Sequence, residues 1–116
     1  MANHVIFIGW NRSIAGREQQ AMQLFQKSME YYGQLQSKGL IESFEPVILV
    51  SHGGDLNGFI LIKGAAQKLD EVRRDETFVN YSIEASYCLD GFGVVPGYIG
   101  ETITDVFSRW SKLIGR

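Results

Sequence analysis

The chain has 116 residues, of which 45% are hydrophobic and 21% charged, so we expect residues 1–116 to fold as one globular domain. Eleven Lys and Arg against thirteen Asp and Glu give a net charge of -2, which offers no overall attraction for nucleic acid. One cysteine excludes an internal disulfide, and two histidines leave few ligands for a structural metal site, so no metal is expected.

No segment resembles a targeting or membrane-spanning sequence. The apolar run at residues 5–8 is far shorter than a signal-peptide core. The longest uninterrupted apolar runs have four residues, against roughly 18 for a membrane span. We therefore expect a cytoplasmic protein that binds neither membranes nor nucleic acid.

The first predicted element is a strand at residues 4–10, where β-branched and aromatic side chains precede a polar segment that begins at Asn11. A long helix is predicted from Arg17 to Gly39. Its apolar side chains recur at spacings of three and four: Ala21, Met22, Phe25, Met29, Tyr32 and Leu35. Gly33 inside this helix, where glycine is costly, is explained by close packing on a strand.

Two further strands are predicted at residues 41–50 and 58–63, joined by a glycine-containing hairpin connection. A second helix is predicted at residues 65–74. Beyond it, apolar and polar side chains alternate from Tyr81 to Tyr87, which is the period of a half-buried strand. We therefore predict a fourth strand that begins near Tyr81 and ends at Pro96.

The last predicted element is an amphipathic helix at about residues 102–114. Its apolar side chains recur at helical spacing: Ile103, Val106, Phe107, Trp110, Leu113 and Ile114. Because so continuous a stripe is costly to leave in water, we expect it to dock on the protein's own dimer. Truncation after Gly100 should then give an aggregating or less stable protein. Binding to a membrane surface is the alternative.

The order of these elements predicts an α+β fold, a ferredoxin-like βαββαβ antiparallel sheet with an additional C-terminal helix. In this order, which covers nearly the whole chain, the sequence resembles the dimeric α/β-barrel superfamily. The resemblance implies a homodimer, and its monooxygenase and isomerase members imply cofactor-independent oxidation or isomerisation of a small hydrophobic substrate. The predicted helices contain no histidine, so the haem of the haem-degrading relatives is not expected and no cofactor is predicted.

The strands themselves also indicate a dimer. The segments 5–8, 47–50 and 59–62 each have four consecutive apolar residues, although consecutive side chains in a strand point to opposite faces. The crossover helices of a ferredoxin-like fold cover one face, so the other needs a second cover. We predict sheet-to-sheet dimerisation. The alternative is a monomer in which the terminal helix folds back over that face.

Candidate ligand-binding residues lie where the first strand ends and the first helix begins. Trp10 offers a stacking surface, and Arg17 can hold an anionic group near the helix N-terminus. We predict that a small-molecule site involves Trp10, Asn11 or Arg17. In the alternative interpretation Trp10 completes the core and the arginines are solvated.

Two other motifs have simpler explanations. His52 and Asp55 are close enough in sequence for an acid–base pair, but a glycine-rich turn favours such residues for its own backbone. Cys88 has no histidine near it in sequence and is expected to be a buried, unreactive thiol. The sequence therefore favours a homodimer that binds a small hydrophobic molecule between sheet and helices. A non-enzymatic oligomeric structural or regulatory module is the alternative, and a filled core would favour it.

Overall fold

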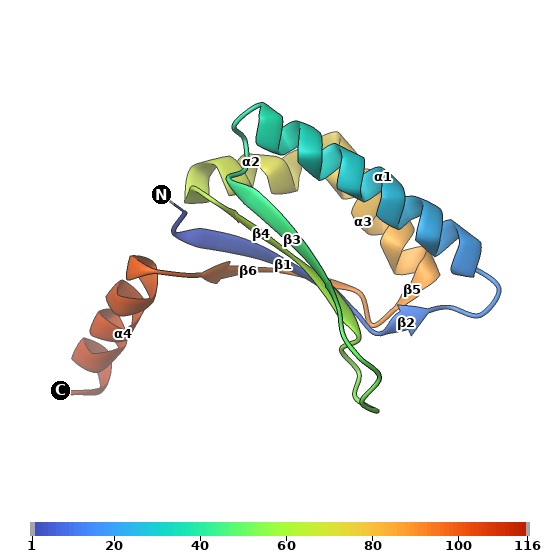
Figure 1. Cartoon of the computed structure of the whole chain (residues 1–116). Coiled ribbons are helices and arrows are strands. Elements are labelled where there is room, and N and C mark those ends of the chain that lie inside the picture. Colours follow the sequence, from blue (N-terminus) through green and yellow to red (C-terminus); the bar gives the residue numbers. More distant parts are fainter. Residues whose placement is uncertain (1, 116) are drawn as a thin grey trace.

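A computed structural model describes residues 2–115 and shows an antiparallel sheet with helices on one side (Figure 1). The main strands are β1 (His4–Trp10), β3 (Ser43–Ile48), β4 (Gly58–Gly64) and β6 (Gly93–Tyr98). The helices are α1 (Glu18–Ser37), α2 (Ala66–Arg74), α3 (Glu76–Cys88) and α4 (Glu101–Ile114). Two short strands, β2 (Arg12–Ser13) and β5 (Leu89–Asp90), pair with each other.

The main sheet has the strand order β3-β4-β1-β6, and every neighbouring pair is antiparallel. This is the arrangement of a ferredoxin-like sheet, as the order of elements predicted. Both edge strands contain a proline, Pro46 in β3 and Pro96 in β6. Because proline cannot donate a hydrogen bond to a neighbouring strand, both edges are poor sites for adding a strand.

Helix α1 follows the predicted pattern and turns one stripe towards the sheet. Its buried residues are Ala21, Leu24, Ser28, Tyr32 and Leu35, which recur every three or four positions as a helix packed on one side requires. The explanation offered for Gly33 is wrong. A Cβ atom at this position would meet no described atom within 4 Å, so no close packing accounts for the glycine.

The predicted fourth strand is wrong in its first half, because residues 81–88 belong to α3. Asp75, with an extended backbone (ψ 137°), separates α2 from α3. The buried residues of α3 are Phe78, Ala85 and Cys88, at helical spacings of seven and three. The alternation at 81–87 is compatible with a strand, but the packing of this face against α1 decides in favour of a helix.

The core lies between the sheet and helices α1 to α3. From the sheet it receives Ile6 and Ile8 of β1 and Ile60 and Ile62 of β4, which are paired across the two strands. Ile6 and Ile62 have 0% of their surface exposed. These residues alternate along each strand, so their neighbours in sequence point to the opposite face.

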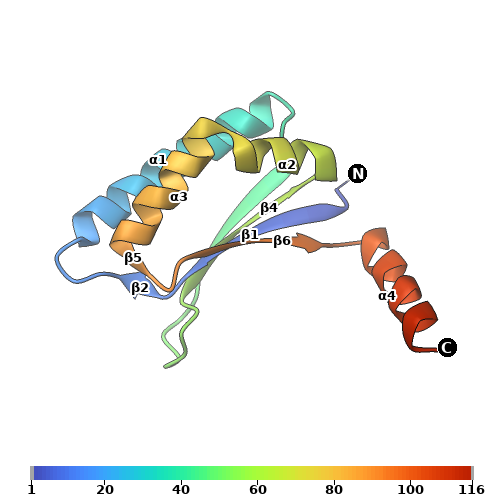
Figure 2. The ribbon, with the colours of Figure 1, turned by 180° about the vertical axis from the view of Figure 1, so that it is seen from behind.

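That opposite face, which we call the open face, is covered by no helix of the described residues (Figures 1 and 2). Register places six apolar side chains on it: Val5, Phe7, Val47, Phe59, Leu61 and Val95. The rings of Phe7 and Phe59 stack with centroids 5.1 Å apart. The sheet therefore has two apolar faces, as the sequence predicted, and the chain itself covers one of them.

Helix α4 projects away from the sheet (Figure 2), and none of its described residues is buried. Trp110, in the middle of its apolar stripe, is 58% exposed. The structure therefore differs from the alternative in which the terminal helix folds back over its own sheet. Within residues 2–115, no helix is both long and apolar enough to cross a membrane.

Candidate functional site

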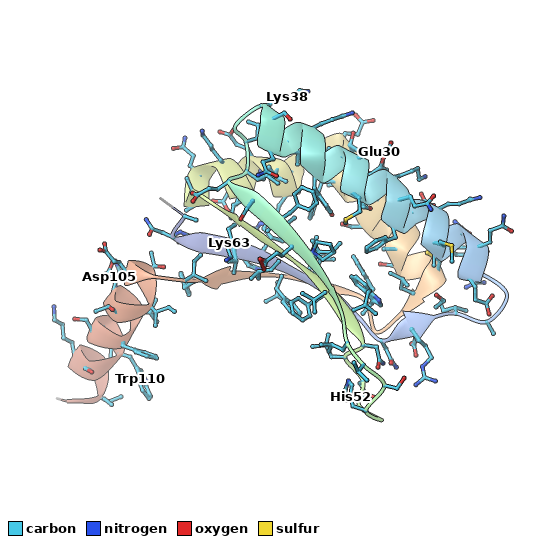
Figure 3. All side chains as sticks on the ribbon, in the orientation of Figure 1. Glu30, Lys38, His52, Lys63, Asp105 and Trp110 are labelled. Carbon is cyan, nitrogen blue, oxygen red and sulfur yellow. The ribbon has the colours of Figure 1, made fainter. Side chains whose placement is uncertain are left out.

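A cavity of about 400 Å³ lies between the sheet and helices α1 and α3, at the end of the sheet where β1 stops. Figure 3 shows side chains pointing from α1 and the sheet into the layer that contains it. The volume is in the range of small-molecule sites, roughly 300–1,000 Å³. A space of this size can hold a small molecule.

The walls of the cavity are apolar. The sheet contributes Ile8, Trp10, Ile48 and Ile60, and α1 contributes Ala21, Met22, Leu24 and Phe25. Ala85 of α3, Leu89 and Phe92 line the remaining side. Small side chains from both helices, Ala21 and Ala85, leave room where larger ones would close the space. A ligand of this cavity would be mainly hydrophobic.

Trp10 forms one end of the cavity. The rings of Trp10 and Phe25 form a T-shaped pair, with centroids 6.3 Å apart. The indole lies over Gly58 of β4, where a Cβ atom would come within 2.6 Å of the ring. Gly58 is therefore needed for this position of Trp10, and the pair of aromatic rings offers an edge and a face to an aromatic ligand.

Five residues with hydroxyl groups interrupt the apolar lining: Ser13, Ser28, Tyr32, Tyr81 and Ser82. Burial, and next the nearby Tyr81, raise the pKa of the Tyr32 hydroxyl, so this group stays protonated and can donate a hydrogen bond. The Ser82 hydroxyl donates to the carbonyl oxygen of Phe78 at 3.0 Å. The hydroxyl groups of the cavity are thus neutral donors and acceptors, four of them from the facing helices α1 and α3 and one from Ser13 of β2.

The rim of the cavity is more exposed. Met22 and Ile48 are large hydrophobic residues that remain largely accessible, and Glu18 in the first turn of α1 is also exposed. Glu18 is the only carboxylate among the described lining residues. The buried part of the site therefore contains no charged group.

Of the three residues predicted for a ligand site, Trp10 lines this cavity, whereas Asn11 and Arg17 are not among its described lining residues. The side-chain oxygen of Asn11 accepts a hydrogen bond from the Asn57 amide. Arg17 donates to the carbonyl oxygen of Tyr87 at 2.9 Å, and its guanidinium lies 3.9 Å from the centre of the Tyr87 ring. Both residues hold neighbouring segments together.

The other motifs do not form a second reactive site. His52 serves the hairpin backbone, because Nδ1 accepts from the Gly54 amide at 3.2 Å and Nε2 lies 2.7 Å from the Leu56 carbonyl oxygen. Cys88 is fully buried, and burial raises the pKa of its thiol, which disfavours the reactive thiolate. Among the described residues, no cluster of three His, Cys, Asp or Glu side chains has the arrangement of a metal site.

The α3 side of the cavity was missed from the sequence. Tyr81, Ser82 and Ala85 line the cavity, but they were placed on a strand, where Ser82 would face away from Tyr81. The signal that would have identified them is the helical spacing of Phe78, Ala85 and Cys88, which are buried together.

Comparison with known proteins shows the fold. No protein-family model matches the chain, and no curated protein matches its sequence. The structure is similar to a solved structure described as a dimeric protein of unknown function and ferredoxin-like fold from Bacteroides fragilis NCTC 9343. The match has a TM-score of 0.58 and 13% sequence identity, and covers 83% of this chain and 96% of that chain. The present chain therefore has a ferredoxin-like fold.

Proposed function

We propose that the protein is a homodimer in which each subunit binds one small, mainly hydrophobic molecule in the cavity between the sheet and helices α1 and α3. The observation that carries the proposal is the cavity of about 400 Å³ with apolar walls and five residues with hydroxyl groups. An aromatic compound with one hydroxyl or carbonyl group matches this lining. Its ring would contact Trp10 and Phe25, and its oxygen would meet Tyr32 or Tyr81.

The dimer part of the proposal is supported by the open face. No helix of the described chain covers this face, and the prolines in β3 and β6 disfavour association through the sheet edges. The similar solved structure is itself described as dimeric. Contact between two open faces would remove the apolar side chains of both sheets from water.

The lining residues favour binding over catalysis. The described lining has no buried carboxylate, histidine or cationic side chain, and the raised pKa of Tyr32 makes its hydroxyl a donor and not a base at neutral pH. Cofactor-independent oxidation or isomerisation, which the superfamily resemblance implies, remains an activity to assay on the bound compound. A cytoplasmic location belongs to the same proposal.

The alternative function is an oligomeric module without a ligand, and the open face is the observation that favours it. Native mass spectrometry of the purified protein separates the two, because it reports both the assembly mass and any retained small molecule. A dimer with a co-purified hydrophobic compound supports binding, whereas a dimer that neither retains nor takes up any compound favours the module.

A direct test uses 2-naphthol as a probe, in a Trp110→Phe background in which Trp10 is the only tryptophan. We expect saturable quenching of Trp10 fluorescence. Ala85→Leu, which adds bulk inside the cavity, should weaken binding at least tenfold, and Gln26→Leu on the exposed side of α1 is the matched control. Thermal unfolding of both variants shows whether each remains folded. Equal affinity for a folded Ala85→Leu protein would contradict this location of the site.

A further inference from the structure

The apolar stripe of α4 is the largest feature of the structure that the proposed function leaves unexplained. Four of its six side chains, Phe107, Trp110, Leu113 and Ile114, are more than half exposed. The helix is 14 residues long, about 21 Å at 1.5 Å per residue. Exposed apolar patches of this size on a soluble protein usually mark an interaction surface.

The position of α4 is fixed at its root. The Thr102 hydroxyl contacts the carbonyl oxygens of Asn3 and Ile99, and the Ile99 amide donates to the Asn3 carbonyl at 3.1 Å. Gly100, with φ +62°, makes the turn between β6 and α4, a backbone conformation that glycine adopts without strain. The helix is therefore anchored to the start of β1 and held away from its own core.

The opposite end of the sheet carries two more exposed apolar side chains, in the β3–β4 hairpin at residues 49–57. Val50 is 87% exposed and Leu56 is 39% exposed. The Leu56 side chain lies beside Gly9 on the open face, since it would be 3.1 Å from a Cβ atom there. Leu56 of the hairpin thus continues the open face at the end where β1 stops.

Helix α4 and the hairpin lie at opposite ends of the sheet but on the same side of it, the side of the open face (Figures 1 and 2). Register confirms the two ends, because Tyr98, before α4, pairs with His4, whereas Gly58, after the hairpin, pairs with Trp10. Suppose that two open faces meet about a two-fold axis that lies between the sheets and runs perpendicular to the strands. The α4 end of one sheet then lies over the hairpin end of the other. One rotation then brings each α4 to the hairpin of the other subunit.

We propose that α4 is an exchanged arm that docks on the 49–57 hairpin of a second copy of the chain. The inference rests on the proposed dimer and deepens it. A stable interface needs about 800 Å² per partner, and five of the six apolar side chains of the open face, all but Val95, are already partly or fully buried in the single chain. The arm and hairpin more than double the number of apolar side chains that the dimer covers. Pairing of α4 with α4 would leave both hairpins uncovered.

Cysteine cross-linking tests the arrangement in the intact protein. Ser108 in α4 and Ser51 in the hairpin are both exposed, and the native Cys88 is fully buried, so it does not compete for reagent. In the double variant Ser51→Cys/Ser108→Cys, a short bis-maleimide should give mainly covalent dimer at micromolar protein. Ser37→Cys/Ser108→Cys is the matched control, because Ser37 lies at the end of α1 on the other side of the sheet (Figure 1).

Each other result overturns a defined part of the inference. A cross-link within one chain would show that the arm docks on its own subunit, and a covalent dimer of Ser108→Cys alone would show pairing of α4 with α4. If the protein sediments as a dimer but the double variant gives no cross-link, only the docking of α4 is wrong. If the unmodified protein sediments as a 13.1 kDa monomer, the proposed dimer fails as well.

A second measurement distinguishes the arm from a membrane anchor. The variant Phe107→Ser/Trp110→Ser should raise the dissociation constant of the dimer at least tenfold in sedimentation experiments, and Lys112→Ser on the same helix should not. Wild-type protein should stay in the supernatant with phosphatidylglycerol vesicles. Vesicle binding that the double variant abolishes, with an unchanged dimer, would overturn the proposal and assign α4 to a membrane surface.

Discussion

Helices α1 and α4 are both amphipathic, yet α1 buries five residues against the sheet and α3, and α4 buries none of its described residues. The difference lies in their connections. Helix α1 crosses between two parallel strands and must lie on the sheet, whereas α4 follows the last strand and is turned away at Gly100. An apolar stripe therefore shows that a helix needs a cover, and the topology decides which surface provides it.

The largest expected effect is on the free energy of unfolding, when a leucine is replaced by alanine in α1 and in α4. Leu35 of α1 is 7% exposed and Leu113 of α4 is 61% exposed. Leu35→Ala should lower the free energy of unfolding by about 2–5 kcal/mol because it leaves a cavity in the core. Leu113→Ala should cost within about 0.5 kcal/mol in dilute protein, and more as the concentration rises and dimers form. Urea unfolding at several protein concentrations measures both, and equal costs in dilute protein would place α4 on its own subunit.

The open face provides the next test. Leu61 lies on it, paired with Phe7 and Glu45. Leu61→Lys should raise the dissociation constant of the dimer about a hundredfold, about 3 kcal/mol, because the new ammonium and the Glu45 carboxylate opposite it would both lose their water between the sheets. Gln26→Lys, on the exposed side of α1, is the matched control. A Leu61→Lys protein that sediments as the wild type would show that the open face is not the interface.

The burial of Tyr32 in α1 should make the free energy of unfolding depend on pH. Tyr32 has a pKa raised above its ordinary value of 10, so below pH 10 both states are neutral and stability is unaffected. Above pH 10 the unfolded chain loses this proton first, and stability falls by up to about 1.4 kcal/mol per pH unit. Tyr31, whose pKa is also raised, acts in the same direction. Tyr32→Phe should therefore reduce the slope of stability between pH 10 and 12 by about one proton, and an unchanged slope would contradict the shift.

The smallest expected effect concerns the first residue before α1. Arg17 stacks on Tyr87 at the surface, and Arg17→Ala should cost about 0.5–1 kcal/mol of stability. Arg17 is not among the described lining residues of the cavity. The affinity of the Arg17→Ala variant for 2-naphthol should therefore stay within twofold of wild type. A larger loss of affinity would return Arg17 to the ligand site.

Strong periodicity was sufficient to predict most of the fold. The strand at 4–10, the helix that begins near Arg17 and the terminal helix agree with the structure within about two residues at their ends. Residues 81–88 were the exception, since their pattern fits both periods and only contact with α1 selects the helix. The same error hid the α3 wall of the cavity. Of the three residues predicted for a ligand site, Trp10 is among the described lining residues of this cavity, whereas Asn11 and Arg17 are not.

The sequence alone determined that the sheet has two apolar faces, because alternation along a strand assigns neighbouring residues to opposite sides whatever the fold. It also determined the amphipathic character of α1 and α4. Only the tertiary structure decided that Trp10, Tyr32 and Tyr81, from three separate elements, surround one cavity. Such a space depends on how far the helices stand from the sheet, and many side chains fix that distance together. The direction of α4 was likewise decided by contacts at its root, between Thr102 and Asn3, which lie 99 residues apart in the chain.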